Sequence, residues 1–359
     1  MELNAMCQPL FEGALDVVGD VHGEAEALHQ LLDVLGYHAT NAWQHPEGRR
    51  LVFVGDLVDR GPDSPGVVER VMDLVDRGIA QCVLGNHELN ILRGADRKEG
   101  NGWFFGRVEA KFETAVQASE EQRARFHAYF SSLPIALFRS DLQIVHAAWN
   151  EASLTQETSA KSPVHWYKKA EKLLVSRLER DGLGERVRNA KRLLPGEEAV
   201  APKYDPEIGL YDSERQNGNP VGQVTSGRED PLRDQAPFHR GGRWRFVSRA
   251  PWWEHLRPDA CVIFGHYWRS IRATEDGRSP DQSNPLAHID GLRWLGPHRN
   301  AFCVDYCAGV RYLGRQKGMD LDACYPLVAI RLPAHVTPGD SHPLIANDGT
   351  VRMTRTLPT

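Results

Sequence analysis

The stretch LVFVGDLVDRG, residues 51–61, decides the fold of this chain. Its first four residues are apolar, and the run is short and ends in a Gly-Asp pair, which predicts a buried strand. That strand delivers Asp56 to its carboxyl end, where ligands bind in open α/β sheets. Asp59 and Arg60 follow in the same loop, and two carboxylates with one guanidinium suit a divalent cation and a phosphoryl group. A solvated Gly-rich turn would explain this loop alone equally well, so its neighbours have to decide.

Two more strands with the same kind of ending lie on either side of this stretch. The apolar runs 15–18 and 80–84 end in a Gly-Asp and a Gly-Asn pair. A helix is predicted between the first two strands, because leucines recur at helical spacing from about Glu24 to a stop at Gly36. A second amphipathic helix is predicted before Gly78. Strands that alternate with helices in this way predict an α/β fold with a wound sheet.

Polar side chains with metal-binding chemistry follow five of the predicted strands. Two of these strands come later in the chain, and the runs 142–145 and 261–264 lead into His146 and His266. The run 301–304 ends in Asp305 but brings no histidine. Each polar end alone has an ordinary explanation as a turn, a cap or a buried imidazole. The joint pattern is the strong signal, and its five clusters are Asp20 with His22, Asp56 with Asp59 and Arg60, Asn86 with His87, His146, and His266.

These clusters supply complete ligand shells for two cations that share one carboxylate. A shared Asp56 would hold the cations about 3.5 to 4 Å apart, where both the attacking and the leaving oxygen of a phosphoryl transfer are stabilised. Mixed imidazole, amide and carboxylate ligands suit transition metals better than magnesium. We therefore expect two divalent ions, Mn first, with Fe or Zn as alternatives. The expected ligands are Asp20, His22 and Asp56 for one ion, and Asp56, Asn86, His146 and His266 for the other.

The motifs GDVHG at 19–23, GDLVDRG at 55–61 and GNHE at 85–88, with the later single histidines, resemble the calcineurin-like metallophosphoesterases. Within that family they are most similar to the phosphoprotein phosphatase group and its bacterial diadenosine tetraphosphatase relatives. The resemblance implies an α/β sandwich of two mixed β-sheets flanked by α-helices, a dinuclear centre and hydrolysis of phosphate esters. The three motifs lie in about the first quarter of the chain, and the histidines extend the resemblance to roughly residue 310.

Chemical roles can be assigned beside that resemblance. A metal-bridging hydroxide, its pKa lowered by two cations, would attack phosphorus in line. His87 would protonate the leaving oxygen, and Asp59 would orient that imidazole and support its charge. Arg60 is placed to fork onto phosphoryl oxygens, and Asn86 would also contact substrate. The family uses a second arginine between its last two histidines, for which we choose Arg249 and hold Arg245 in reserve.

The substrate is less sharply indicated. Leu84 before GNHE, and Ala147 with Ala148 after His146, are similar to the bacterial branch, whereas Glu88 is similar to the protein phosphatases. We expect a phosphomonoesterase acting on phosphoserine or phosphothreonine, or on a small phosphoester. The alternative is a nucleoside polyphosphate hydrolase of the diadenosine tetraphosphatase type, and a non-catalytic scaffold is a remote one. Aromatic residues that could stack on a base, although core packing explains most of them, are Trp103, Phe104, Trp252, Trp253 and Trp268.

Composition excludes several classes of partner. The chain has 359 residues and a formal net charge of −5, which gives no general attraction to nucleic acid or anionic membranes. Residues 1–13 contain no Lys or Arg and no long apolar run, so we expect neither a secretory signal nor a membrane span and place the protein in the cytoplasm. Six scattered cysteines argue against a disulfide scaffold. The sequence leaves the oligomeric state open.

We expect one domain over residues 1–335 and a weakly ordered tail at 336–359. Two insertions, at about 93–132 and 150–243, interrupt the strand pattern. Residues 195–243 are rich in Pro, Gly, Asp and Arg, which predicts a long irregular segment.

Overall fold

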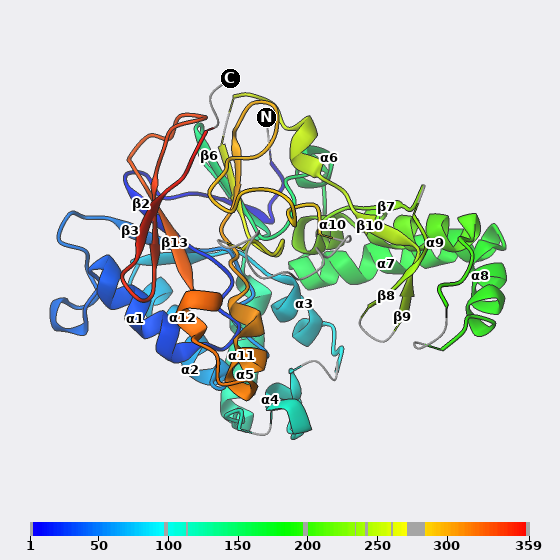
Figure 1. The fold of residues 1–359 in the computed structure, drawn as a ribbon, viewed down its shortest axis with the longest axis horizontal. Coiled ribbons are helices and arrows are strands. Elements are labelled where there is room, and N and C mark those ends of the chain that lie inside the picture. The colour runs from blue at the N-terminus through cyan, green and yellow to red at the C-terminus, as the bar shows by residue number, and fades with distance from the viewer. Residues whose placement is uncertain are drawn as a thin grey trace.

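Two mixed β-sheets form the centre of the computed structural model (Figure 1). The structure describes residues 3–96, 100–112, 114–196, 200–233, 235–240, 243–259, 261–270 and 284–356. The larger sheet consists, in spatial order, of β15 (Val351–Met353), β14 (Pro343–Ala346), β13 (Val328–Leu332), β2 (Leu15–Val18), β3 (Arg50–Phe53) and β4 (Ala80–Cys82). The smaller sheet consists of β1 (Cys7–Pro9), β5 (Ala136–Phe138), β6 (Leu142–Val145), β11 (Cys261–Phe264) and β12 (Ala301–Cys303).

Each sheet contains three neighbouring parallel strands at one side. β2, β3 and β4 run parallel, and so do β6, β11 and β12, whereas β13, β14 and β15 pair antiparallel. Because the carboxyl ends of parallel strands lie at one edge of a sheet, the loops after these strands gather there. The expected α/β sandwich of two mixed sheets is confirmed.

The hydrophobic core between the sheets follows from the alternation of side chains along each strand. Val17 and Val52 point into the same fully buried cluster as Ile144 and Ile263 of the smaller sheet. Their strand neighbours point to the opposite face, where Phe53 joins the cluster that contains the buried leucines of the first helix. The central strands are therefore buried on both faces, as their continuous apolar runs predicted.

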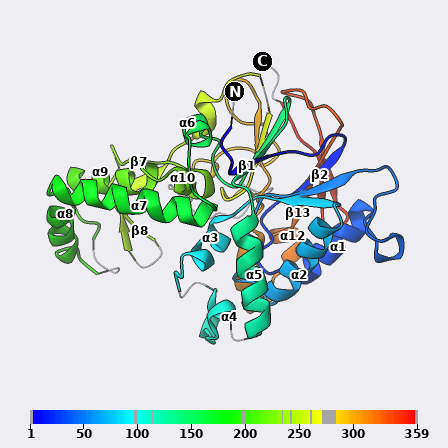
Figure 2. The ribbon, with the colours of Figure 1, turned by 180° about the vertical axis from the view of Figure 1, so that it is seen from behind.

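Helices cover the outer face of the larger sheet. α1 (Ala25–Leu35), α2 (Ser64–Asp76) and α5 (Glu120–Ser132) lie next to one another there, as Figure 2 shows from behind. α1 ends at Gly36, which has the left-handed φ of 98° that glycine adopts at helix ends. The remaining short helices are α3 (Asn86–Leu92), α4 (Gly102–Phe105), α6 (Glu151–Thr155), α11 (Arg311–Gln316) and α12 (Leu321–Cys324), with 3₁₀ turns η1 (Ala39–Asn41), η2 (Ala110–Phe112), η3 (Trp252–His255) and η4 (Ala308–Val310).

The described residues between 163 and 249 form an extension that we call the arm, most of which projects sideways from the two sheets in both views. It contains α7 (Pro163–Arg180), α8 (Leu183–Arg192), α9 (Pro206–Asn217), α10 (Pro220–Ser226), β7 (Glu229–Pro231), β8 (Phe238–Arg240), β9 (Arg243–Arg245) and β10 (Val247–Arg249). The arm has a separate apolar cluster, formed by Leu174, Leu178, Leu183, Val187, Ile208 and Phe246.

The prediction of an irregular segment at 195–243 was wrong in two places, where the chain forms α9 and α10. α9 and α10 begin with an Asp-Pro and an Asn-Pro pair, which we interpreted as turn signals. In the structure Asp205 and Asn219 are N-caps, and their side chains accept hydrogen bonds from backbone N–H groups of the first helical turn. The following prolines occupy the first helical position, where the missing N–H costs nothing.

The prediction of a weakly ordered tail was also wrong. β14 pairs with β13, and β15 pairs with β14, so Pro343–Ala346 and Val351–Met353 extend the larger sheet. Leu344 and Ile345 are buried there. Strands of three or four residues are too short to show a period, although the Asp348-Gly349 turn between them was a local signal. Within the described residues, no helix combines the length and apolarity needed to cross a bilayer.

Candidate metal centre

The loops after five strands meet at one edge of the two sheets, and they bring the six predicted ligands together. The Nε2 atom of His146 lies 3.4 Å from Oδ2 of Asp56, and Nε2 of His22 lies 3.8 Å from the same oxygen. His22 is also 4.0 Å from a carboxylate oxygen of Asp20. Residues that are more than 200 positions apart in sequence thus lie within a few ångströms, since the backbone N–H of His266 donates to the Asp20 carboxylate at 3.1 Å.

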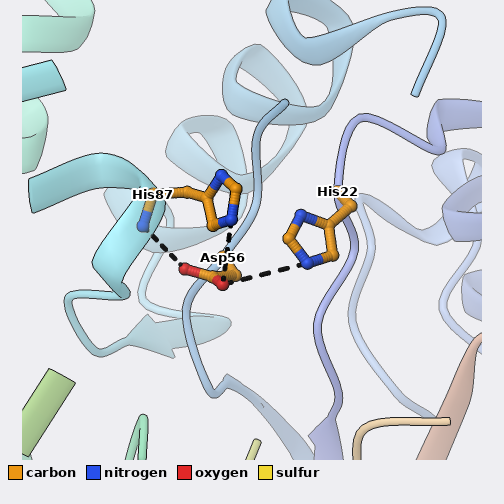
Figure 3. Close-up of side chains that lie close together, drawn as sticks. All are labelled: His22, Asp56 and His87. Atoms are coloured by element: carbon orange, nitrogen blue, oxygen red, sulfur yellow. Dashed lines mark hydrogen bonds and ion pairs between the residues drawn. The ribbon is translucent and has the colours of Figure 1, made fainter. Parts of the chain in front are cut away.

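Two groups of side chains have the geometry to hold a cation, and both contain Asp56. One consists of His22, Asp56 and His87, and the other of Asp56, His146 and His266. Within each group the candidate ligand atoms lie within 4.8 Å of one another. Figure 3 shows the first group, in which both imidazoles turn toward the Asp56 carboxylate. The shared carboxylate is the arrangement expected of a dinuclear centre.

The loops that carry these residues are held in strained but well-bonded conformations. His22, Asp56 and His266 have φ values of 50°, 48° and 65°, in the left-handed region that costs non-glycine residues about 1 kcal/mol or more. The backbone N–H groups of Val21 and His22 donate to the Asp56 carbonyl at 3.0 and 2.9 Å. A Cβ atom on Gly85 would meet the Asp56 nitrogen at 2.2 Å, so the approach of these two loops requires glycine.

Backbone carbonyls orient two of the imidazoles. Nδ1 of His22 lies 3.0 Å from the Val58 carbonyl, and Nδ1 of His146 lies 2.7 Å from the Val54 carbonyl. A carbonyl can only accept, so both Nδ1 atoms carry the proton and both Nε2 atoms present a lone pair toward Asp56. This is how proteins orient histidines that bind metals.

The surroundings of Asn86 test whether the donor set fits a metal. One terminal atom of its amide lies 2.7 Å from Nδ1 of His266, 3.2 Å from Nε2 of His146 and 3.3 Å from Oδ2 of Asp56. With the amide oxygen at that position, four electron-pair donors surround one point. A divalent cation would satisfy all four at once, so the residues present fit a transition metal with mixed nitrogen and oxygen ligands.

Electrostatics favour two neutral imidazoles, His22 and His266, beside the ionised carboxylate of Asp56. Burial lowers the pKa of His22 and of His266 well below the usual range, and the neighbouring arginines act in the same direction. Burial would raise the pKa of Asp56, but the surrounding imidazoles, His146 foremost, hold it well below its usual range. Burial opposes protonation of His146, but Asp56 raises the pKa of His146 above its usual range, so a metal would displace a proton there. His22 and His266 offer lone pairs to a metal near neutral pH.

Asp305 is a buried carboxylate of this region that sequence reasoning left out of the ligand sets. Burial raises its pKa to about 6, and its Oδ2 atom has no hydrogen-bond partner among the described residues. Burial, then Asp305 and Asp56, raise the pKa of Asp20 well above its usual range. This concentration of acidic groups would be relieved by bound cations. The available signal was its place directly after a predicted strand.

The residues predicted to act on substrate lie in the first group, which contains His87, and beside it. Nδ1 of His87 is 2.6 Å from Oδ2 of Asp59, as expected of an imidazole oriented by a carboxylate. The guanidinium of Arg60 lies 3.3 Å from Nε2 of His87 and 3.3 Å from Nε2 of His22. Among the described residues Arg60 forms no ion pair with a carboxylate, which leaves its charge available for an anion.

Arg249 and Arg245, the two candidates for the second phosphate-binding arginine, have different surroundings. Arg249 lies on β10, and its guanidinium is 3.0 Å from Nε2 of His266. Arg245 forms an ion pair with Glu229, which neutralises its charge. The geometry therefore favours Arg249, and its contact with substrate stays a prediction.

The five aromatic residues that could stack on a base differ in their exposure. Four of the five are buried and offer no open face to a base, namely Trp103, Phe104, Trp252 and Trp253. Trp268 is half-buried, and its ring centroid lies 5.9 Å from the guanidinium carbon of Arg60. It is the member of the predicted set that lies at the edge of the site.

Comparison with known proteins identifies relatives over part of the chain. The chain is 39% identical over 126 residues to the asymmetrical bis(5'-nucleosyl)-tetraphosphatase PrpE of Halalkalibacterium halodurans, covering 33% of this chain and 48% of the relative. It is 45% identical over 151 residues to PrpE of Geobacillus thermodenitrificans, covering 37% and 56%. The chain thus spans about half the length of the curated relatives it matches.

Solved structures and a family model extend the comparison. A protein serine/threonine phosphatase from Saccharomyces cerevisiae is 14% identical with a TM-score of 0.44, covering 97% of this chain and 81% of that one. A cold-active protein-tyrosine phosphatase of a Shewanella species is 14% identical with a TM-score of 0.43, covering 99% and 83%. At such scores the likeness says nothing about substrate. The sequence model of the calcineurin-like phosphoesterases matches residues 14–201, and this chain belongs to that family.

Proposed function

We propose that this protein is a hydrolase of nucleoside polyphosphates that uses two divalent transition metals. The observation that carries the proposal is the pair of residue groups that share Asp56. Membership of the calcineurin-like phosphoesterases supports the reaction class. The names of the curated relatives, asymmetrical bis(5'-nucleosyl)-tetraphosphatases, support the substrate class.

This proposal adopts the alternative that the sequence left open in place of the phosphoserine or phosphothreonine substrate. Glu88 was the residue that favoured the protein phosphatases. Its carboxylate accepts hydrogen bonds from the backbone N–H groups of Asp56, Leu57 and Gly85 at 3.0, 2.8 and 3.1 Å. Because Glu88 ties the loops together and faces no open space, its identity carries no information on substrate.

Six residues would hold the metals. The proposed ligands are Asp20, His22 and Asp56 for one ion, and Asp56, Asn86, His146 and His266 for the other. Bound cations would lower the pKa of a water molecule and neutralise negative charge on the phosphoryl oxygens. Mn is the first choice, with Fe and Zn as alternatives. A non-catalytic scaffold is disfavoured, because every proposed ligand is a competent donor that faces the same space.

The chain's own residues would bind the phosphate and move the proton. Arg60 and Arg249 would hold phosphoryl oxygens through charged hydrogen bonds. As a water oxygen loses a proton to solvent and forms its bond to phosphorus, the bond to the leaving oxygen breaks, and Nε2 of protonated His87 would donate a proton to that oxygen. His87 would then take up a proton from solvent. Asp59, at 2.6 Å from Nδ1, would stabilise the imidazolium before transfer.

Turnover measurements on the manganese-loaded protein test this proposal. We expect kcat/KM for diadenosine tetraphosphate to exceed that for a phosphoserine or phosphothreonine peptide by at least about tenfold, a margin of 1.4 kcal/mol in transition-state binding. A preference for the phosphopeptides would restore the first prediction in place of this one. The cytoplasmic location and the lack of nucleic-acid or membrane partners stay predictions from composition.

Replacement of His87 tests the mechanism. His87→Asn should lower the turnover of an aryl phosphate by about 10²- to 10⁴-fold, the usual contribution of a general acid, and leave the metal content unchanged. His127→Asn is the matched control, because His127 is exposed on α5. Full activity of His87→Asn would remove His87 from the mechanism.

A further inference from the structure

Trp103 makes a polar contact that core packing does not explain. Its indole Nε1 donates a hydrogen bond to Oδ1 of Asp59 at 2.7 Å, and the other oxygen of that carboxylate lies 2.6 Å from Nδ1 of His87. We propose that Trp103 is a positioning residue that holds His87 in its proton-donating orientation by acting through Asp59. The inference rests on the proposed role of His87 as the proton donor.

The three side chains form one buried chain of hydrogen bonds. Trp103, Asp59 and His87 are 2%, 3% and 7% exposed, so water does not replace a lost partner easily. The terminal torsion of an aspartate is soft, so one hydrogen bond alone would leave the carboxylate plane free to turn. With each oxygen engaged by a different ring, both the plane and the imidazole that it contacts are held.

The backbone under Asp59 needs such support. Asp59 and Arg60 have φ values of 73° and 70°, which L-residues adopt only when the surroundings hold them there. The Asp59 N–H donates to the Ser64 hydroxyl at 2.9 Å. On the other side, a Cβ on Gly100 would lie 2.6 Å from the Arg60 nitrogen, so the turn that carries Trp103 presses directly on this loop.

The turn at 100–109 is itself braced. The Glu109 carboxylate accepts hydrogen bonds from the N–H groups of Gly100 and Gly102 at 3.0 and 2.8 Å. The Trp103 carbonyl accepts from the Ala118 N–H at 3.0 Å. A rigid turn can therefore fix the indole against Asp59. The first insertion, at about 93–132, would thus help to orient His87, the proposed proton donor.

The packing of the indole separates its polar role from its apolar one. Trp103 contacts the rings of Phe104 and Phe126 at centroid distances of 5.5 and 6.3 Å. A phenylalanine at position 103 could fill much of this space but could not donate to Asp59. Trp103→Phe thus removes the hydrogen bond, whereas Phe126→Leu disturbs the same cluster and keeps it.

The inference is tested by how the loss of kcat depends on the leaving group of the substrate. An alkyl phosphate needs a proton on its leaving oxygen, whereas 4-nitrophenyl phosphate releases a stable anion without one. In the manganese-loaded protein, Trp103→Phe should lower kcat for the alkyl ester at least about tenfold more than for the nitrophenyl ester, as part of the 10²- to 10⁴-fold contribution of an acid. Phe126→Leu should lower both rates by the same factor. Equal losses, or no loss, for Trp103→Phe would overturn the inference.

His87→Asn, measured in parallel, separates this inference from the proposed function. If His87→Asn lowers kcat more for the alkyl ester than for the nitrophenyl ester while Trp103→Phe lowers both equally, the inference about Trp103 is wrong and the proton-donor role of His87 stands. If His87→Asn does not discriminate between the two esters, the proton-donor role fails and the inference falls with it.

A second measurement needs no catalysis. In the metal-free protein, the indole N–H of Trp103 is the NMR resonance missing from Trp103→Phe. Its exchange with solvent should be slow in the wild type and at least about tenfold faster in Asp59→Ala, because the acceptor is gone. Unchanged exchange in Asp59→Ala would show that this hydrogen bond does not hold the indole and would overturn the proposal.

Discussion

The two-sheet sandwich and the arm differ in where their charged groups lie. The sandwich contains buried ion pairs, and Asp16, with an exposed fraction of zero, is bound by Arg49 and Arg331. In the arm, most of the described pairs lie on the surface, as in Arg186 with Glu207, which are exposed by 53% and 49%. Exposed pairs contribute little to stability, so the arm depends on its small apolar cluster.

That difference separates the proposed tasks. All proposed metal ligands come from the sandwich, with Asn86 at the start of α3 and the others in loops, whereas the arm supplies only Arg249, at the end of β10. Metal binding and substrate binding should therefore respond to different substitutions. The predictions below test whether metal binding depends on the sandwich alone while substrate binding also depends on the arm.

The largest expected effect is at the shared carboxylate. Asp56→Asn removes the charged ligand common to both residue groups, so we expect loss of both metals and a fall in activity on the order of 10³-fold or more. Metal analysis of the purified variant and its turnover of an aryl phosphate measure this. Asp33→Asn, at an exposed position on α1, is the control. Two tightly bound metals in Asp56→Asn would contradict the shared-ligand arrangement.

Arg249 should affect substrate without affecting metal. A charged hydrogen bond contributes about 1.5–3 kcal/mol, so Arg249→Ala should lower kcat/KM by roughly 10- to 100-fold. The metal content should stay at the wild-type level. Arg245→Ala should have a smaller effect, because Arg245 is already paired with Glu229. A larger effect for Arg245→Ala would assign the role to the reserve residue.

Phe246→Ala tests whether the arm can unfold while the two sheets stay folded. This side chain is fully buried in the arm's cluster, and Phe246→Ala should cost about 3–5 kcal/mol. Hydrogen exchange should increase in α7–α9, while metal content stays unchanged and KM rises because Arg249 loses its support. Uniform loss of protection across both sheets would show that the two regions unfold as one.

The smallest expected effect is a pH-dependent one in the sandwich. Asp141 accepts hydrogen bonds from Arg139 at 2.6 Å and from the Val336 N–H at 2.7 Å. Burial opposes ionisation, but these partners hold the pKa of Asp141 below its usual range. The unfolded chain therefore takes up the proton first as the pH falls. The stability contributed by ionised Asp141 is complete above about pH 4 and is lost below it.

Urea unfolding of wild type and Asp141→Asn at pH 3 to 7 measures this contribution. The difference in free energy of unfolding should be about 1.5–3 kcal/mol at pH 6 and should shrink below pH 4. A difference that stays constant down to pH 3 would mean that Asp141 is not held ionised by its partners.

Local chemistry predicted much of the sandwich. β2 spans the residues predicted for it, and β3 lies within one residue of its predicted run. Their apolar runs and Gly-Asp ends are short-range signals that need no partner. The tail strands were missed because their pairing partner, β13, provides the apolar surface that makes strands of three or four residues stable.

The same limit applied to the candidate site. The sequence could name Trp103, but only the fold shows that its indole faces Asp59, 44 positions away. Asp305 was visible after a strand, yet its effect on Asp20 depends on β12 lying in the other sheet. Likewise Arg245 and Arg249 are equivalent in sequence pattern and differ only through Glu229.

The sequence by itself determined the strands that precede the five polar clusters, the turns that end them and the ligand chemistry at those turns, because these depend on neighbours within a few residues. Tertiary structure alone decided which of those turns share a space. Packing of the two sheets brings His146 and His266 to Asp56, and packing of α4 against α5 buries Trp103, whose indole contacts Asp59. Such contacts join positions far apart in the chain, and no local pattern encodes their distance.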